Sequence, residues 1–211
     1  MNSIWHQPQS VILHQLKDQW NGVVIRFVPM SLNVVMKNSG NSPPGMLPFR
    51  YDMMLTDLER TSKYWGIPLK PPPLLMEWAI EYRTTDAMRV LLVLEERDYD
   101  LMVRAAREMW LRLWYRSEKI FEEVDFRAVL NAIGVDDADD VIRKSREPKY
   151  KTKLVENTEK LEKAYGAPWI TVLTADGAEH QFFGSDRFPL IAELIGRPHP
   201  LPRRLRTTPK L

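Results

Sequence analysis

The polar cluster Gly184-Ser185-Asp186 lies where the sequence predicts a turn from a strand into a helix. Glycine lets a backbone or a ligand approach closely, and serine and aspartate are good N-cap residues. The free amides of a first helical turn attract a carboxylate, and Asp186 can accept a hydrogen bond from an ammonium group. The cluster could therefore bind the zwitterionic end of an amino acid, although helix capping is the simpler interpretation of the same residues.

A second candidate site is the pair Ala167-Pro168, which follows Gly166 and precedes the predicted strand Trp169–Leu173. Proline has no N–H to donate to a central ladder, so Pro168 should lie at the edge or at the first position of that strand. A cis peptide bond can occur before a proline, although a trans bond is far more common. The sequence leaves both states of this bond open.

Composition excludes several kinds of chemistry. The 211 residues include no cysteine, which excludes disulfides, thiolate metal sites, iron–sulfur clusters and a cysteine nucleophile. The four histidines have no metal-ligand spacing with a carboxylate, and there is no glycine-rich phosphate loop. A net charge of +2 argues against a dedicated nucleic-acid role, and no apolar run approaches the roughly 18 residues of a membrane helix.

Three segments have the composition of strands. Residues 23–28 are mostly β-branched and follow a turn signal, which predicts a buried strand. Residues 169–173 and 180–183 predict two antiparallel strands joined by the turn Asp176-Gly177.

The chain between these strands has helical periodicity from Tyr51 to Tyr165. Residues 38–48, with three prolines and two glycines, predict a loop before this block. Helices are predicted over residues 87–96, with Thr85-Asp86 as the cap, and over 101–116, 118–133, 137–145 and 149–165. The tryptophans of the block are predicted to be core residues rather than ligand-stacking ones: Trp65, Trp78, Trp110 and Trp114. An α/β layer split by an all-helical insertion fits this order.

Four stretches together resemble the kappa-class glutathione S-transferases: residues 36–45, which contain NSGNSPPG, the aromatic helix 109–114, Gly-Ala-Pro at 166–168, and FGSDR at 183–187. The resemblance runs from about Phe27 to Leu201. It implies an α/β fold with a thioredoxin-like sheet domain and an all-helical insertion, as in the DsbA-like bacterial oxidoreductases. The implied boundaries are 1–50 and 158–205 for the thioredoxin-like domain, 51–157 for the insertion and 206–211 for a flexible basic tail.

The same resemblance implies a glutathione-binding site. It places Asn41 in a loop that contacts glutathione, and it has Ala167 offering its backbone amide and carbonyl to the cysteinyl part, next to Pro168 as a cis-proline. Ser185 and Asp186 would hold the γ-glutamyl carboxylate and ammonium. This is the zwitterion that the residue types of the cluster suggested independently.

The N-terminal part departs from the family pattern. Family members begin with a β-strand and a Ser-Pro-Tyr-Ser-type turn whose first serine stabilises the glutathione thiolate, and this sequence starts too late for that strand. An ungapped alignment on Trp20 places Ser3 on the catalytic serine, but its flanking residues do not reproduce the motif. A hydroxyl stabilises a thiolate only when it is held in place. Arg50 falls where the family often has a lysine and could meet the glycyl carboxylate.

The resemblance predicts an enzyme of detoxification that activates the glutathione thiol for conjugation to a small electrophile, such as a halonitroarene, or for reduction of a hydroperoxide. Glutathione would be a co-substrate, with no other cofactor. A homodimer is expected, with no nucleic-acid or membrane partner. Two alternatives stay open. One is a degenerate, non-catalytic glutathione-binding or scaffold protein. The other is a glutathione-dependent enzyme like 2-hydroxychromene-2-carboxylate isomerase.

The last three residues, Pro209-Lys210-Leu211, resemble a variant of the Ser-Lys-Leu peroxisomal signal. The expected location is therefore the peroxisome, with the mitochondrion or the cytoplasm as alternatives.

Overall fold

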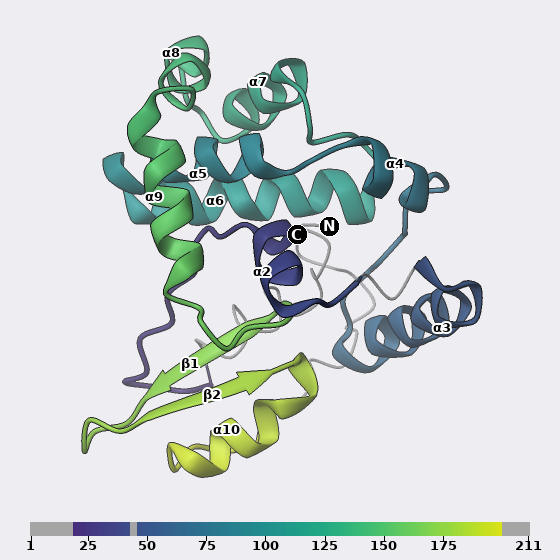
Figure 1. Cartoon of the computed structure of the whole chain (residues 1–211), viewed down its shortest axis with the longest axis vertical. Coiled ribbons are helices and arrows are strands. Elements are labelled where there is room, and N and C mark those ends of the chain that lie inside the picture. The colour runs from purple at the N-terminus through teal and green to yellow at the C-terminus, as the bar shows by residue number, and fades with distance from the viewer. Residues whose placement is uncertain (1–18, 43–45, 200–211) are drawn as a thin grey trace. The chain divides into compact units, whose positions relative to one another are not determined.

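The computed structural model describes residues 19–42 and 46–199, which form two compact units (Figure 1). One, which we call the helical unit, contains the described residues 27–42 and 70–165. The other, the hairpin unit, contains residues 19–26, 46–69 and 166–199. The boundaries of these two compact units differ from those of the predicted insertion at 51–157. The predicted domain boundaries stay a prediction. The predicted tail, 206–211, lies outside the described residues.

The helical unit confirms the predicted helical block. Its elements are α2 (Leu32–Ser39), α4 (Leu75–Glu81), α5 (Thr85–Arg97), α6 (Tyr99–Trp110), the π-helical turn η3 (Leu111–Tyr115), α7 (Glu123–Ala132), α8 (Ala138–Lys144) and α9 (Pro148–Glu159). Helix α5 packs against α6, α8 and α9 (Figure 1). Among the described residues, no helix is both long enough and apolar enough to cross a membrane.

The core of this unit follows the predicted apolar stripe of α6. Met102, Ala105 and Met109 are buried, and the stripe continues through Leu113 and Trp114 in η3. Apolar residues that recur every three to four positions form one face of a helix, and that face packs against the neighbouring helices. Of the four tryptophans predicted to be core, Trp65, Trp110 and Trp114 are buried. Trp78 is half-buried, and its ring makes a T-shaped contact with Phe121.

Two helix starts differ from the prediction. Helix α5 has Thr84 at its N-cap, and Asp86, instead of capping, pairs with Arg89 at 2.5 Å in the first turn. Helix α7 begins at Glu123 rather than near residue 118, because Glu122 and Asp125 form a reciprocal capping box. Residues 118–122, which were predicted to begin this helix, therefore belong to the loop that precedes α7.

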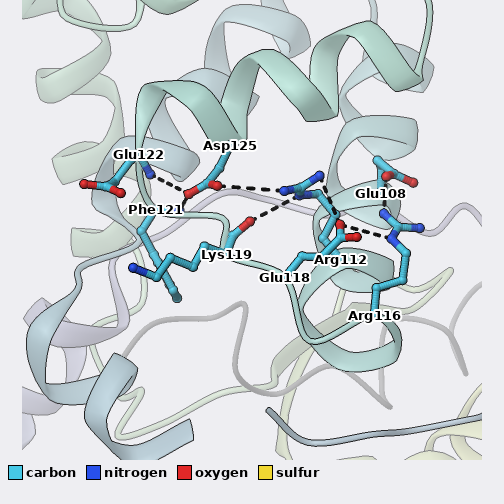
Figure 2. A network of polar contacts seen from close by, with 8 residues as sticks. All are labelled: Glu108, Arg112, Arg116, Glu118, Lys119, Phe121, Glu122 and Asp125. Atoms are coloured by element: carbon cyan, nitrogen blue, oxygen red, sulfur yellow. Dashed lines mark hydrogen bonds and ion pairs between the residues drawn. The ribbon is translucent and has the colours of Figure 1, made fainter. Parts of the chain in front are cut away.

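That loop is held by a network of buried and half-buried charges (Figure 2). The side chain of Arg112, which is 16% exposed, contacts Glu118 at 3.0 Å and Asp125 at 3.8 Å, and donates to the carbonyl of Lys119 at 3.2 Å. Asp125 also accepts the backbone N–H groups of Phe121 and Glu122 at 2.9 and 3.0 Å. The residues between η3 and α7 form no helix or strand, and these contacts hold them in place.

Residues 23–28 are not the buried strand that the sequence predicted. The segment belongs to no strand among the described residues, and its side chains alternate between half-buried and exposed positions. β-Branched residues favour extended backbone, but a ladder needs a neighbouring strand. The predicted loop at 38–48 is also shorter, since α2 continues to Ser39 and α3 begins at Pro48.

The hairpin unit consists of α3 (Pro48–Trp65), β1 (Trp169–Leu173), β2 (Glu179–Phe183), the 3₁₀ turn η4 (Ser185–Arg187) and α10 (Phe188–Leu194). The two strands pair antiparallel, as predicted. The buried core of the unit joins α3 and α10 through Trp20, Trp65, Ile67, Phe188, Ile191 and Ala192. Ile170, Val172 and Phe182 of the hairpin pack against it.

Candidate functional site

The β1–β2 hairpin brings the two candidate motifs together. Trp169 pairs with Phe183 in the antiparallel register, so Pro168 and Gly184 are the next facing positions beyond the ladder. The N–H of Gly184 donates to the carbonyl of Pro168 at 3.2 Å. The strand-edge proline and the polar turn, which the sequence predicts separately, thus share one end of the hairpin.

Gly166 and Ala167 shape one side of this end. A Cβ on Gly166 would lie 2.8 Å from Cε2 of Phe183, so the aromatic ring fills the space that a side chain would need. The Ala167–Pro168 peptide bond is cis. Ala167 is 5% exposed, and neither its N–H nor its C=O has a hydrogen-bond partner among the described residues. The backbone here offers one donor and one acceptor.

Gly184 makes the sharp turn on the other side. Its φ of 97° and ψ of 153° fall in a region that essentially only glycine adopts, and a Cβ there would collide with Oδ1 of Asp186. The turn leads directly into η4. The backbone conformation therefore requires glycine at this position, and any larger residue would also have to displace the carboxylate of Asp186.

The side chains of Ser185 and Asp186 do not cap a helix. Neither η4 nor α10 receives a side-chain cap hydrogen bond, which removes the simpler interpretation of these residues. The Ser185 hydroxyl has no partner among the described residues. Asp186 is 70% exposed and pairs with Arg187 at 3.3 Å. Such an exposed pair is weak, so the carboxylate stays available to a cationic group.

The turn at the other end of the hairpin sets the register in which β1 and β2 pair. Oδ1 of Asp176 accepts from the Thr174 hydroxyl at 2.5 Å and from the Ala178 N–H at 3.2 Å. These two hydrogen bonds lower the pKa of Asp176 below its ordinary value. Gly177 follows with a φ of 85°, which confirms the predicted Asp-Gly turn.

The other predicted site residues are placed differently. Asn41 belongs to the helical unit, where its Nδ2 donates to the carbonyl of Tyr165 at 2.6 Å. Arg50 is exposed on the first turn of α3, and its side chain makes no ion pair within the described part of the chain. Ser3 lies outside the described residues.

Sequence reasoning missed the link between Asn41 and Tyr165. The two residues are 124 positions apart, and no local pattern indicates such a contact. It also missed the packing of Phe183 on Gly166, although a glycine two residues before Pro168 was a usable signal of close approach.

Comparison with known proteins decides the family. The DSBA-like thioredoxin domain model matches residues 9–196. Glutathione S-transferase kappa 1 of Caenorhabditis elegans is 60% identical over 196 residues, which are 92% of this chain and 87% of the relative. Glutathione S-transferase kappa 1 of Homo sapiens is 34% identical over 189 residues, or 88% and 83% of the two chains.

The chain belongs to the kappa-class glutathione S-transferases. This membership confirms the resemblance that the motifs carried, and it confirms the DsbA-like α/β fold with a helical insertion. The roles of the individual site residues stay predictions.

Proposed function

We propose that this chain binds glutathione across the end of the β1–β2 hairpin and activates its thiol for transfer. The proposal rests on one observation: polar groups before β1 and after β2 lie together at one end of the hairpin. The backbone of Ala167 and the hydroxyl of Ser185 flank the Gly184–Pro168 hydrogen bond, and both lack partners among the described residues. Buried backbone groups are normally paired, so an unpaired donor and acceptor beside a polar turn favour a ligand.

Glutathione has groups that suit this end of the hairpin. Its cysteinyl N–H and C=O can pair with the C=O and N–H of Ala167, as an added strand would. Its γ-glutamyl carboxylate can accept from the Ser185 hydroxyl, and its ammonium group can donate to Asp186. Arg50 is assigned to the glycyl carboxylate. Charge-assisted hydrogen bonds of this kind are stronger than neutral ones, so the two ends of the tripeptide would supply much of the affinity.

The reaction then needs a stabilised thiolate. The thiol of a free cysteine titrates near 8.5, so glutathione is mostly protonated at neutral pH. A hydroxyl that donates to sulfur lowers this pKa, and we assign that donor to Ser3 by its place in the alignment. The thiolate attacks the ring carbon of a halonitroarene, the carbon–sulfur bond forms and halide leaves. With a hydroperoxide, two glutathione molecules give the disulfide, an alcohol and water.

Calorimetry and a conjugation assay on the full chain test this proposal. We expect saturable heat on titration with glutathione and turnover of a halonitroarene. Ser3→Ala should lower kcat about a hundredfold while the Kd for glutathione stays the same. Ser10→Ala, in the same segment, is the matched control and should change neither value. The absence of binding at millimolar glutathione would reject the site. Binding without conjugation or peroxide reduction would reject the transferase and favour a non-catalytic role.

A further inference from the structure

The ring of Phe183 lies against the backbone of Gly166, and both residues belong to the hairpin unit. A Cβ on Gly166 would lie 2.8 Å from Cε2 and 3.3 Å from Cζ of that ring. Gly166 is buried and its φ is not positive, so no left-handed backbone calls for glycine here. The ring is therefore the feature that favours glycine at this position, whereas at Gly184 it is the backbone.

The core of the hairpin unit uses Phe182 rather than Phe183. Phe182 packs against that core together with Ile170 and Val172. Successive side chains of a strand point to opposite faces, so Phe183 points to the other face of β2. Its ring therefore meets the Gly166 backbone on the face of the hairpin that the core does not use.

The backbone on the two sides of Ala167 differs in how far its own chemistry restrains it. On the far side, the proline ring fixes φ, and the carbonyl of Pro168 accepts the N–H of Gly184 at 3.2 Å. On the near side, glycine tolerates the widest range of backbone angles. The N–H of Ala167 belongs to the peptide on the glycine side, where the ring of Phe183 packs.

We infer that Phe183 is a positioning residue: its ring restrains Gly166 and thereby fixes the N–H of Ala167 for a ligand. A donor that is already ordered loses less entropy on binding, so the restraint should raise the affinity for a ligand that pairs with Ala167. The effect on glutathione rests on the proposed function, whereas the restraint in the free protein does not.

Phe183→Leu tests the inference because it removes the ring that lies on Gly166 and keeps an apolar side chain. Phe182→Leu is the matched control, since it makes the same change on the core face of the same strand. Carbonyl-¹³C glycine combined with ¹⁵N alanine labels the two Gly-Ala steps of the sequence, which end at Ala167 and Ala178. Ala178 follows the turn at the other end of the hairpin and serves as an internal reference.

In the free protein, Phe183→Leu should lower the order parameter of the Ala167 N–H from about 0.85 to below about 0.6. The Kd for glutathione should rise about three- to tenfold. Phe182→Leu should lower the thermal midpoint at least as much as Phe183→Leu, but it should change neither the order parameter of Ala167 nor the Kd. The order parameter of Ala178 should be the same in all three proteins.

The reverse substitution gives an independent test. Gly166→Ala alone forces its Cβ against the ring and should weaken glutathione binding about tenfold. In the Phe183→Leu background, the same alanine enters space that the ring has left and should change the Kd by no more than about twofold. Independent losses of stability would add in the double variant, so only residues in contact produce this rescue.

An unchanged order parameter of Ala167 in Phe183→Leu would overturn the inference. An equal decrease in Phe182→Leu, or additive losses in the double variant, would overturn it as well. A lower order parameter with an unchanged Kd would overturn the effect on glutathione. A lower order parameter together with no glutathione binding by the wild type would support the restraint and reject the proposed function instead.

Discussion

The helical unit and the end of the hairpin use their polar groups in opposite ways. In the helical unit, Arg112 contacts Glu118, Asp125 and the carbonyl of Lys119, so each of these three charged side chains has a partner within the network (Figure 2). At the hairpin end, the backbone of Ala167 has no partner among the described residues. Closed networks add to the stability or the uniqueness of a fold, whereas open groups are available to a ligand. Substitutions in the first region should therefore alter unfolding, and those in the second should alter binding.

The largest effect on stability should come from the core of the helical unit. Leu113 is fully buried, and Leu113→Ala leaves a cavity that should lower the free energy of unfolding by about 2 to 5 kcal/mol. The matched control is Leu173→Ala on the hairpin, where the side chain is 73% exposed and the cost should stay below about 0.5 kcal/mol. Urea unfolding measures both. Equal losses of unfolding free energy in the two variants would contradict the expectation that the cost depends on the burial of the side chain.

Breaking the network at Asp125 should have the next largest effect. Asp125→Ala removes the acceptor of two backbone N–H groups and one partner of Arg112, which should cost about 1.5 to 3 kcal/mol. Asp139→Ala is the control, because Asp139 is 79% exposed and forms a surface ion pair with Arg127. Its cost should be below about 1 kcal/mol. The Kd for glutathione should not respond to either substitution, and a large change in it would contradict the division of roles.

Gly184→Ala should act on binding more than on stability. Alanine would have to adopt a conformation that only glycine tolerates, and its Cβ would meet the side chain of Asp186. The substitution should cost about 1 to 3 kcal/mol of stability and weaken glutathione binding more than about tenfold. Gly177→Ala in the same hairpin also has a positive φ but meets no atom within 4 Å, so binding should persist. Calorimetry on both variants measures the difference. Unchanged affinity in Gly184→Ala would contradict the proposed geometry.

The smallest effect should be the pH dependence of a surface pair in the helical unit. The hydrogen bond from Arg97 lowers the pKa of Asp137 below its ordinary value of 3.8. A lowered folded-state pKa stabilises the fold above pH 3.8, and the contribution disappears as the pH falls through the lower value. Because Asp137 is 53% exposed, the loss should be only a few tenths of a kcal/mol.

Urea unfolding at pH 5 and pH 2.5 tests this sign. The stability difference between the wild type and Arg97→Met should shrink at the lower pH, while Lys151→Met should show no such trend. A difference that grows on acidification would contradict the assigned direction.

Local patterns were sufficient for much of the fold, including the hairpin that brings the two candidate motifs together. The Asp176-Gly177 turn predicts the hairpin, and its register is what aligns Pro168 with Gly184. The apolar spacing of α6 predicts its buried face. Both signals act over a few residues, where periodicity and turn chemistry decide the backbone.

The failures involve partners that are distant along the chain. Residues 23–28 have a strand composition, but a ladder depends on a neighbour that composition does not specify. The side chain of Asn41 reaches a carbonyl 124 positions away, and no local pattern predicts that contact. The implied contact of its loop with glutathione stays a prediction. Long-range polar contacts of this kind come from the folded arrangement and leave no local trace.

The most direct test of the central proposal compares two ligands by calorimetry: glutathione and cysteinylglycine, which lacks the γ-glutamyl group. If Ser185 holds the γ-glutamyl carboxylate, Ser185→Ala should weaken glutathione about tenfold or more and leave the affinity for cysteinylglycine unchanged. An equal loss for both ligands, or no loss for either, would contradict the assignment of that end of the tripeptide to the turn after Gly184.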